Sequence, residues 1–360
     1  MLSACEQENK FEQDENVLSL EEELKLIEQK ENIVLSSEGY LMFKNHEVYD
    51  SINKMVDKMT NEEFITWEDQ SGFTSAQTYL LNACDELDSA QTVEEYNEIK
   101  KKYSENLFFE EDGSIKLPFY ATAWSRILNV EGIMKVGNVL FKFDNEKEYM
   151  IFDGETEDIN NLDILSEDTT KVRIYEPGKS TKINSAKLKS AIAGEWNFPT
   201  IISDNGKKRL KGSVQTIINY YTGYGLTSTY YTEMWLEFKL EMLQEAKSLF
   251  NKWSPNKTVY CINCFDLHYE YYKHGSANNN TGPTGSYTWG DLVVYNDYIG
   301  EQQCSAEMKG TCVLSMIDYY ECTRGYHPQT DLYIYRLDLN LWSRGVGYDK
   351  RYHVDDYNNI

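Results

Sequence analysis

The chain has 360 residues, of which 41% are hydrophobic and 14% aromatic, so it can form a sizeable packed core. Its net charge of −24, from 59 acidic and 35 basic residues, argues against nucleic-acid binding and against adhesion to anionic lipids, because both need clustered Lys and Arg. No run of ~18 apolar residues is present that could span a bilayer. The length favours about two domains.

The first residues, Leu2-Ser3-Ala4-Cys5, have the form of a bacterial lipobox, in which the cysteine is lipidated when the leader is cut. Only Met1 precedes this box, so we expect the basic and apolar parts of the leader to be encoded upstream of Met1. We predict lipidation at Cys5 and no other attachment to a membrane. The alternative is a chance occurrence of these four residues in a cytosolic chain.

Residues 6–38 contain eleven acidic residues and three lysines, with few aromatics and no sustained apolar face. Such a stretch cannot bury enough apolar surface to offset the entropy of ordering it. We therefore predict that residues 1–38 form the lipobox and a solvated acidic tether.

Residues 39–190 are predicted to form a helical cluster followed by a small β unit. Between residues 40 and 107 the apolar residues recur with the helical period, and Thr-x-x-Glu capping boxes begin at Thr60 and Thr92. Gly72 is expected to end the helix that Thr60 begins.

The β unit begins after Pro118. Alternating residues surround Gly137-Asn138, which is a strong signal for a hairpin, and two more strands are expected at 147–152 and 171–175. The polar stretch 176–190 then marks the domain boundary.

Residues 191–360 are predicted to form an antiparallel β-sandwich, which makes the whole chain an α+β protein. Alternating runs are separated by Gly, Asn and Ser clusters at irregular intervals, as in sandwiches. The stretch 240–250 has a helical alternative, and residues 278–286 are expected to be a loop. The expected strands are residues 209–221, 230–240, 258–272, 292–298, 313–320 and 331–341.

Five of the seven cysteines lie in the last hundred residues, and in an exported protein such a cluster indicates disulfides. Cys304 and Cys312 flank a polar stretch that can close as a loop, so we predict a disulfide between them. Cys84 lies on the apolar face of a helix and is expected to be a buried small hydrophobe.

Cys261-x-x-Cys264, followed by His268 and His274, contains the residue types of a zinc site. In a strand, however, the two cysteines point to opposite faces, and no second Cys-x-x-Cys follows at finger spacing. We expect a disulfide or buried thiols here and no metal.

No motif assigns a catalytic site. A Gly-x-Ser-x-Gly elbow and a Gly-rich phosphate loop are both absent, and no cofactor is expected. A hydrolase that works through two carboxylates stays open, with Asp266 and Glu270, or Asp291 and Asp297, as examples of such pairs.

Aromatic residues gather in the C-terminal part, which holds twenty of the 28 tyrosines and five of the seven tryptophans. Exposed aromatic side chains stack on sugar rings and form protein interfaces, although tyrosine is also an ordinary strand residue. Tyr287 and Trp289 follow the Asn- and Gly-rich loop instead of lying inside an alternating strand. They are the predicted ligand-binding residues.

These features together resemble a family. The lipobox and the acidic tether are followed by Trp67-Glu68, by the segment 128–138 and by the run Lys208-Arg209-Leu210-Lys211-Gly212. A chain with these features in this order resembles uncharacterised Bacteroidetes cell-envelope lipoproteins. The resemblance covers most of the chain. It implies an anchored envelope protein with a β-rich C-terminal part, and it carries no known active site.

Our leading hypothesis is an outer-membrane lipoprotein, exposed at the cell surface, whose β-sandwich binds a glycan or an envelope or host protein. The acidic tether would hold this module away from the membrane. The rival hypothesis is an envelope hydrolase with paired carboxylates in the β-rich part, and a third is a purely structural assembly protein.

Overall fold

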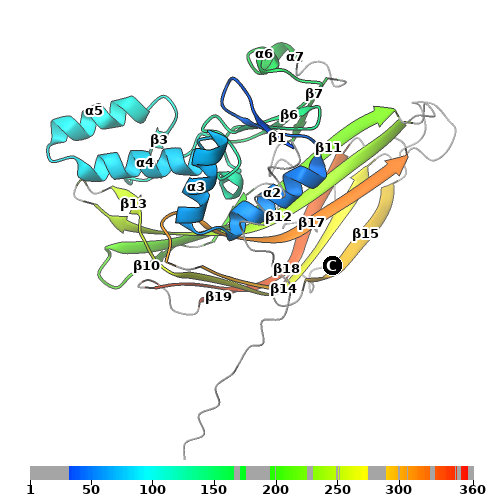
Figure 1. The fold of residues 1–360 in the computed structure, drawn as a ribbon. Coiled ribbons are helices and arrows are strands. Elements are labelled where there is room, and N and C mark those ends of the chain that lie inside the picture. Colours follow the sequence, from blue (N-terminus) through cyan, green and yellow to red (C-terminus); the bar gives the residue numbers. More distant parts are fainter. Residues whose placement is uncertain are drawn as a thin grey trace, which may run out of the picture.

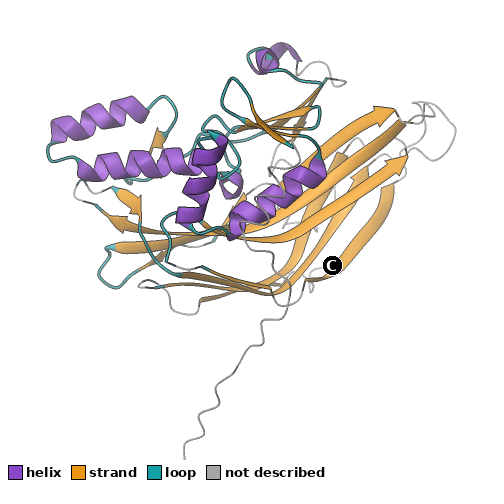
Figure 2. Ribbon diagram, in the orientation of Figure 1, coloured by secondary structure: helices purple, strands orange, loops and turns teal. Residues whose placement is uncertain are grey.

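The computed structural model describes residues 32–165, 171–175, 195–198, 200–224, 230–248, 252–274, 289–298, 301–305, 307–324, 329–344 and 350–355, with residues 250 and 346. The predicted α+β class is confirmed, because the described helices precede residue 166 and strands form the C-terminal part. The helices lie on one side of the long C-terminal strands (Figure 2). Cys5 and most of the predicted tether lie outside the described residues.

Four helices follow one another as predicted: α2 (His46–Lys58), α3 (Asn61–Ser71), α4 (Ala76–Ser89) and α5 (Val93–Tyr103). They do not pack only on one another, since α2 and α4 also contact strands of the C-terminal part. Shorter helices are η1 (Thr122–Trp124), α6 (Thr156–Ile159) and α7 (Leu162–Leu165).

Capping side chains explain where the helices begin. The capping box at Thr60 is complete, because its hydroxyl accepts from the Glu63 amide at 3.3 Å while the Glu63 carboxylate accepts from the Thr60 amide at 2.8 Å. At Thr92 the capping box is incomplete. The Thr92 hydroxyl accepts from the Glu95 amide, but the Glu95 carboxylate accepts from the amide of Gln91 instead of that of Thr92. Gly72 ends α3 with φ of 67°, a left-handed conformation that glycine adopts without strain.

The N-terminal sheet has the strand order β1-β2-β5-β6-β7-β8. All neighbours are antiparallel except β2 and β5, which are parallel. The hairpin predicted at Gly137-Asn138 joins β5 to β6 and is confirmed. The strands are β1 (Ile33–Leu35), β2 (Leu41–Phe43), β5 (Ile133–Val136), β6 (Val139–Phe143), β7 (Glu148–Phe152) and β8 (Val172–Tyr175), with a separate pair β3 (Phe108–Phe109) and β4 (Ile115–Lys116).

One part of the tether prediction is wrong. Ile33–Leu35 forms β1, which pairs with β2 at the edge of the N-terminal sheet. The high acidic content of the preceding residues hid this short apolar run, whose backbone hydrogen bonds are supplied by a strand close in sequence.

The C-terminal part contains two larger sheets (Figure 1). The inner sheet, next to the helices, has the order β10-β11-β12-β13, with β9 paired to β11 and β17 to β12. The outer sheet has the order β15-β14-β18-β19, with β16 paired to β14. Their strands are β9 (Glu195–Asn197), β10 (Ile201–Ile202), β11 (Lys208–Tyr224), β12 (Tyr230–Lys247), β13 (Trp253–Pro255), β14 (Tyr260–His274), β15 (Trp289–Tyr298), β16 (Glu301–Cys304), β17 (Cys312–Arg324), β18 (Gln329–Ser343) and β19 (Lys350–Asp355).

The two sheets pack face to face where their side chains are described, as the sandwich prediction requires. Ser343 of the outer sheet donates to the Gln244 side chain at 2.7 Å, and the Tyr260 hydroxyl accepts from the Gln244 amide at 2.9 Å. At Gly212 the sheets approach so closely that a Cβ atom would lie 2.5 Å from a methyl carbon of Leu341. A larger residue at this position would have to displace the Leu341 side chain.

The helical alternative for residues 240–250 is wrong. β12 continues to Lys247 because it pairs with β11 along its whole length and with β17 and β13 on its other side. Pairing on both edges outweighs the helical spacing of Leu243, Ala246 and Phe250, which is a local preference only.

Among the described residues, the larger of two hydrophobic clusters joins the two predicted domains. The same cluster of buried residues includes Phe43, Trp67 and Trp124 from the first and Phe238 and Leu341 from the second. The predicted boundary at 176–190 lies outside the described residues, so its position stays a prediction. Within the described part of the chain, no helix has the length and apolar composition needed to cross a bilayer.

Candidate functional site

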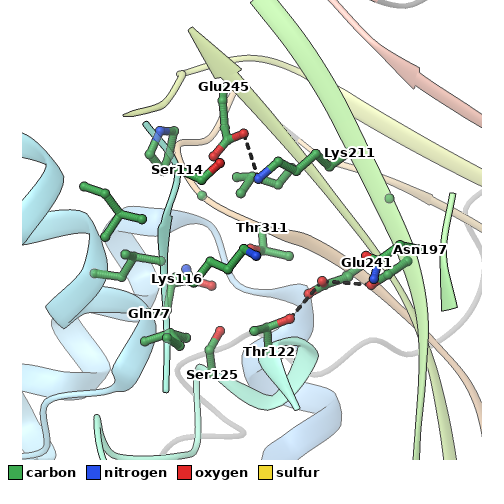
Figure 3. Close-up of a pocket in the computed structure, with 18 of the residues that line it drawn as sticks. Gln77, Ser114, Lys116, Thr122, Ser125, Asn197, Lys211, Glu241, Glu245 and Thr311 are labelled. Atoms are coloured by element: carbon green, nitrogen blue, oxygen red, sulfur yellow. Dashed lines mark hydrogen bonds and ion pairs between the residues drawn. The ribbon is translucent and has the colours of Figure 1, made fainter. Parts of the chain in front are cut away.

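A cavity of about 480 Å³ lies where the N-terminal region meets the inner sheet (Figure 3). One wall comes from α4, the β3–β4 hairpin and η1, and the other comes from β9, β11 and β12, with the chain just before β17. Apolar atoms of Phe119, Phe198 and Leu243 form part of the lining. The labelled polar residues are Gln77, Ser114, Lys116, Thr122, Ser125, Asn197, Lys211, Glu241, Glu245 and Thr311.

Strand periodicity places the charged residues of β12 on the helical side of the inner sheet. Successive side chains point to opposite faces, so Phe238 and Met242 are buried in the core while Glu241 and Glu245 line the cavity. Lys211 and Ser213 of β11 lie on the same face. The inner sheet is therefore apolar toward the outer sheet and polar toward the helices.

At one end of the cavity, which we call the acidic end, Glu241 is surrounded by neutral donors. Its Oε1 accepts from Thr122 at 2.8 Å, from Ser213 at 2.9 Å and from Gln215 at 2.9 Å. Gln215 is fully buried and its carbonyl accepts from the Ala123 amide at 2.7 Å. These bonds hold the carboxylate in one orientation, between η1 and the inner sheet.

At the other end, which we call the basic end, Arg209 is 7% exposed and makes three polar contacts. Its Nε donates to Glu245 at 2.5 Å, Nη1 to Asp112 at 2.9 Å and Nη2 to Ser114 at 2.6 Å. Lys211 also contacts Glu245, with Nζ 3.0 Å from the same carboxylate oxygen. One buried carboxylate thus holds two cations.

The surroundings of Arg209 keep Asp112 ionised. Hydrogen bonds from Ser114 and from Arg209 hold the pKa of the Asp112 carboxyl below its usual range. The guanidinium also lies over the ring of Trp253, 4.3 Å from its centroid. Arg209 is therefore a fixed part of the wall.

Lys116 reaches into the cavity from the wall opposite Lys211 (Figure 3). It extends toward Thr311, and its Nζ lies 3.2 Å from Glu110. Both members of this pair are exposed, with side-chain exposures of 56% and 44%. The cavity therefore has a lysine ammonium group on each wall.

The chain before β17 closes one side of the cavity against the helices. Gly310 has φ of 107°, and a Cβ atom there would lie 3.3 Å from the Gln77 side chain. The Asn61 side chain donates to the Lys309 carbonyl at 2.8 Å, and Lys309 forms an ion pair with Asp85. These contacts attach the segment to α3 and α4.

The side chains of the two residues predicted to bind a ligand lie outside the part of the chain that the structure describes. Tyr287 lies outside the described residues, and Trp289 begins β15, where its backbone pairs with His274. The side chain of Trp289 is not among those described. Their role stays a prediction.

The predicted Cys304–Cys312 disulfide is wrong, because Cys312 is a free, buried thiol. Burial raises its pKa to about 12. Cys261 is disulfide-bonded, and it lies directly opposite Cys304 in the β14–β16 pairing. The spacing along the chain pointed to a loop closure, whereas Cys312 begins β17 in the inner sheet. Cys84 is free and buried, as expected.

The disulfide at Cys261 rules that cysteine out as a zinc-ligating thiolate. Among the described residues, no group of three or more His, Cys, Asp or Glu side chains is arranged to hold a metal ion.

Sequence reasoning missed the residues that line the cavity. A signal was present: Glu237, Lys239, Glu241 and Glu245 share one face of a strand whose other face is apolar. Such a pattern indicates a polar face, but it does not say whether that face meets solvent or other parts of the chain.

The chain is similar to a crystal structure of a DUF4848 family protein from Bacteroides thetaiotaomicron, with 17% sequence identity, coverage of 90% of this chain and 98% of that chain, and a TM-score of 0.29. That neighbour belongs to a Bacteroidetes family of unknown function. A likeness at this TM-score carries no argument about function. No protein-family model and no curated protein matches the sequence.

Proposed function

We propose that this chain is a binding protein that takes a small polyhydroxylated ligand, a saccharide, in the cavity between the N-terminal region and the inner sheet. The observation that carries the proposal is the lining of this cavity, in which hydroxyl, amide and carboxylate side chains converge from both walls. A volume of about 480 Å³ lies within the ~300–1,000 Å³ that is usual for ligand pockets.

The chemistry of the lining fits sugar hydroxyl groups. Each sugar hydroxyl both donates and accepts, and Glu241, Asn197 and Gln77 offer planar acceptors and donors at the cavity surface. Phe119 and Phe198 add apolar surface, against which the C–H face of a sugar ring packs. The mixture of polar groups and a few aromatic side chains is typical of specific small-molecule sites.

The position of the carboxylates favours binding over hydrolysis. Glu241 and Glu245 are four residues apart on an extended strand, so their Cα atoms are separated by about 13 Å. Glycoside hydrolysis needs two carboxylates that face the same bond, whereas the Glu241 carboxylate already accepts from Thr122, Ser213 and Gln215. Glu245 is engaged by two cations, Arg209 and Lys211.

We propose further that the protein is anchored in the cell envelope through a lipid at Cys5. The support is the lipobox Leu2-Ser3-Ala4-Cys5 and the acidic residues that follow it. Cells that express the gene with its upstream codons should incorporate labelled palmitate into the protein, and Cys5→Ala should abolish the label. A protein that stays unlabelled and soluble would exclude the anchor.

The ligand proposal is tested with the purified full chain on a glycan array, followed by calorimetry with the sugars that bind. Glu241→Gln removes a charge while keeping the shape of the side chain, and we expect the affinity to fall at least tenfold. The urea midpoint of each variant shows whether it is folded.

Variants at the sequence-predicted aromatic residues, Tyr287→Ala and Trp289→Ala, are measured alongside, because they test the alternative position of the ligand. Loss of binding in these two variants, with Glu241→Gln unaffected, would place the ligand outside the cavity. Turnover of a bound glycan would replace the binding function with the hydrolase hypothesis.

A further inference from the structure

Two lysines enter the cavity from opposite walls. Lys116 belongs to β4 in the N-terminal region, and Lys211 belongs to β11 in the inner sheet. In Figure 3 both side chains extend into the cavity, Lys116 toward Thr311 and Lys211 toward Glu245. Each ammonium group can donate three hydrogen bonds and has no acceptor of its own.

The present partners of these lysines can be given up at little cost. The Lys116–Glu110 pair is exposed on both sides, and such pairs contribute little to stability. Lys211 is 31% exposed, and its partner Glu245 is 3% exposed. When Lys211 turns away, Glu245 still keeps its bond to Arg209 at 2.5 Å, so no buried charge is left without a cation.

We propose that the ligand is an acidic saccharide, a uronic acid, whose carboxylate lies between Lys116 and Lys211. This inference rests on the proposed saccharide-binding function and names the class of sugar. Two charge-assisted bonds from opposite walls hold a carboxylate more strongly than neutral donors do.

The acidic end of the cavity sets the direction of the ligand. In the register of the inner sheet, Glu241 pairs with Ser213 and Leu243 pairs with Lys211. These two cross-strand pairs are two residues apart, so the backbone positions of Glu241 and Lys211 are separated by about 7 Å along the strand direction. This spacing is close to the width of one sugar ring. The Glu241 carboxylate repels a like charge and accepts from hydroxyl groups, so the sugar carboxylate lies at the lysines and the ring hydroxyls lie at Glu241.

The test is calorimetry of the full chain with matched sugars: galacturonate against galactose and glucuronate against glucose, as mono- and disaccharides. We expect the acidic member of a pair to bind at least tenfold more tightly. Lys116→Met and Lys211→Met should each reduce this acid preference about tenfold. Lys101→Met, an exposed lysine of α5 outside the cavity, should keep the wild-type preference.

The outcomes separate this inference from the proposed function. If neutral and acidic sugars bind equally and the lysine variants keep the wild-type ratio, the acidic ligand is excluded while saccharide binding stands. If no sugar of the panel or the array binds, both proposals fail. Tighter binding of free L-glutamate than of any sugar also overturns the inference. Lys116→Gln and Lys211→Gln repeat the test if a methionine variant shows a lowered urea midpoint.

Discussion

At the start of β7, Glu148 is a carboxyl group with no exposed surface. Burial raises its pKa well above the ordinary value of 4.5, and the charge of Glu237 adds to this, while a bond from the Tyr120 hydroxyl at 3.3 Å opposes it. Its Oε1 has no hydrogen-bond partner in the described part of the chain. The folded protein therefore holds this proton to a higher pH than the unfolded chain does.

We expect Glu148→Gln to be more stable than the wild type at pH 8, with a difference that shrinks toward pH 5. An acid with a raised folded-state pKa stabilises the fold fully below its unfolded pKa, and this contribution is lost as the pH rises toward the folded value. A tenfold difference in proton affinity between the folded and unfolded states corresponds to about 1.4 kcal/mol of stability. Urea unfolding at both pH values measures the difference.

The control is Glu146→Gln, an exposed carboxyl group two residues earlier on the same turn, whose effect should be small at both pH values. Equal effects of Glu148→Gln at pH 5 and pH 8 would show that the buried carboxyl group does not titrate as described.

At the scale of elements, one buried ion pair connects α2 to β12. Lys239, which is 1% exposed, donates to Asp57 at 2.6 Å and to Asn53 at 2.7 Å, and its ammonium group lies 5.0 Å from the centroid of the Trp124 ring. Glu237, on the same face of β12, accepts from Asn53 at 2.9 Å and from the Trp124 indole at 2.8 Å. A layer of buried polar groups thus aligns the helices with the inner sheet.

We predict that Lys239→Met lowers the free energy of unfolding by about 3–5 kcal/mol, because it leaves the Asp57 charge buried without its cation. Asp57→Asn should have a similar effect, and the double variant should lose less than the sum of the two. Chemical denaturation measures all three.

A matched control is available on α2 itself. Lys54 pairs with Asp50 at 2.9 Å on the exposed face of the helix, so Lys54→Met should cost less than ~1 kcal/mol. A cost for Lys239→Met as small as that of Lys54→Met would show that the buried pair does not attach α2 to the sheet.

At the scale of the whole molecule, the N-terminal region and the sandwich share one hydrophobic core. On the charged face of β12, Glu237 and Lys239 are buried against side chains of α2 and η1. Neither part satisfies its buried groups without the other, so the two should unfold together although the chain is long enough for two domains.

We therefore predict that α2 and β12 lose protection at the same urea concentration in a hydrogen-exchange experiment read peptide by peptide. Peptides that cover 46–58 and 230–247 report the two elements separately. An exposed element such as α5, whose residues are mostly accessible, should open at lower urea. If the 46–58 peptide exchanges well before the 230–247 peptide, the two regions unfold as separate domains.

Sequence reasoning predicted the class of fold, the four helices and the long C-terminal strands, and it predicted little of the candidate site. The helix starts were readable because capping at Thr60 involves residues three apart. The hairpin at Gly137-Asn138 was also readable, because it too depends on residues close together in the sequence. The helical alternative at 240–250 failed because pairing partners far along the chain decided that β12 is a strand.

What the sequence by itself determined is local: the element types, the helix ends and the alternation that gives β12 an apolar face and a charged face. Only the tertiary structure decided which surface each face meets. Lys116 and Lys211 are 95 residues apart in the chain, and Cys312 lies in a different sheet from Cys304. Such neighbours are set by the packing of whole layers, because the free energy of burial depends on the total surface removed from water. This total buried surface cannot be read from the number of residues that separate two positions in the sequence.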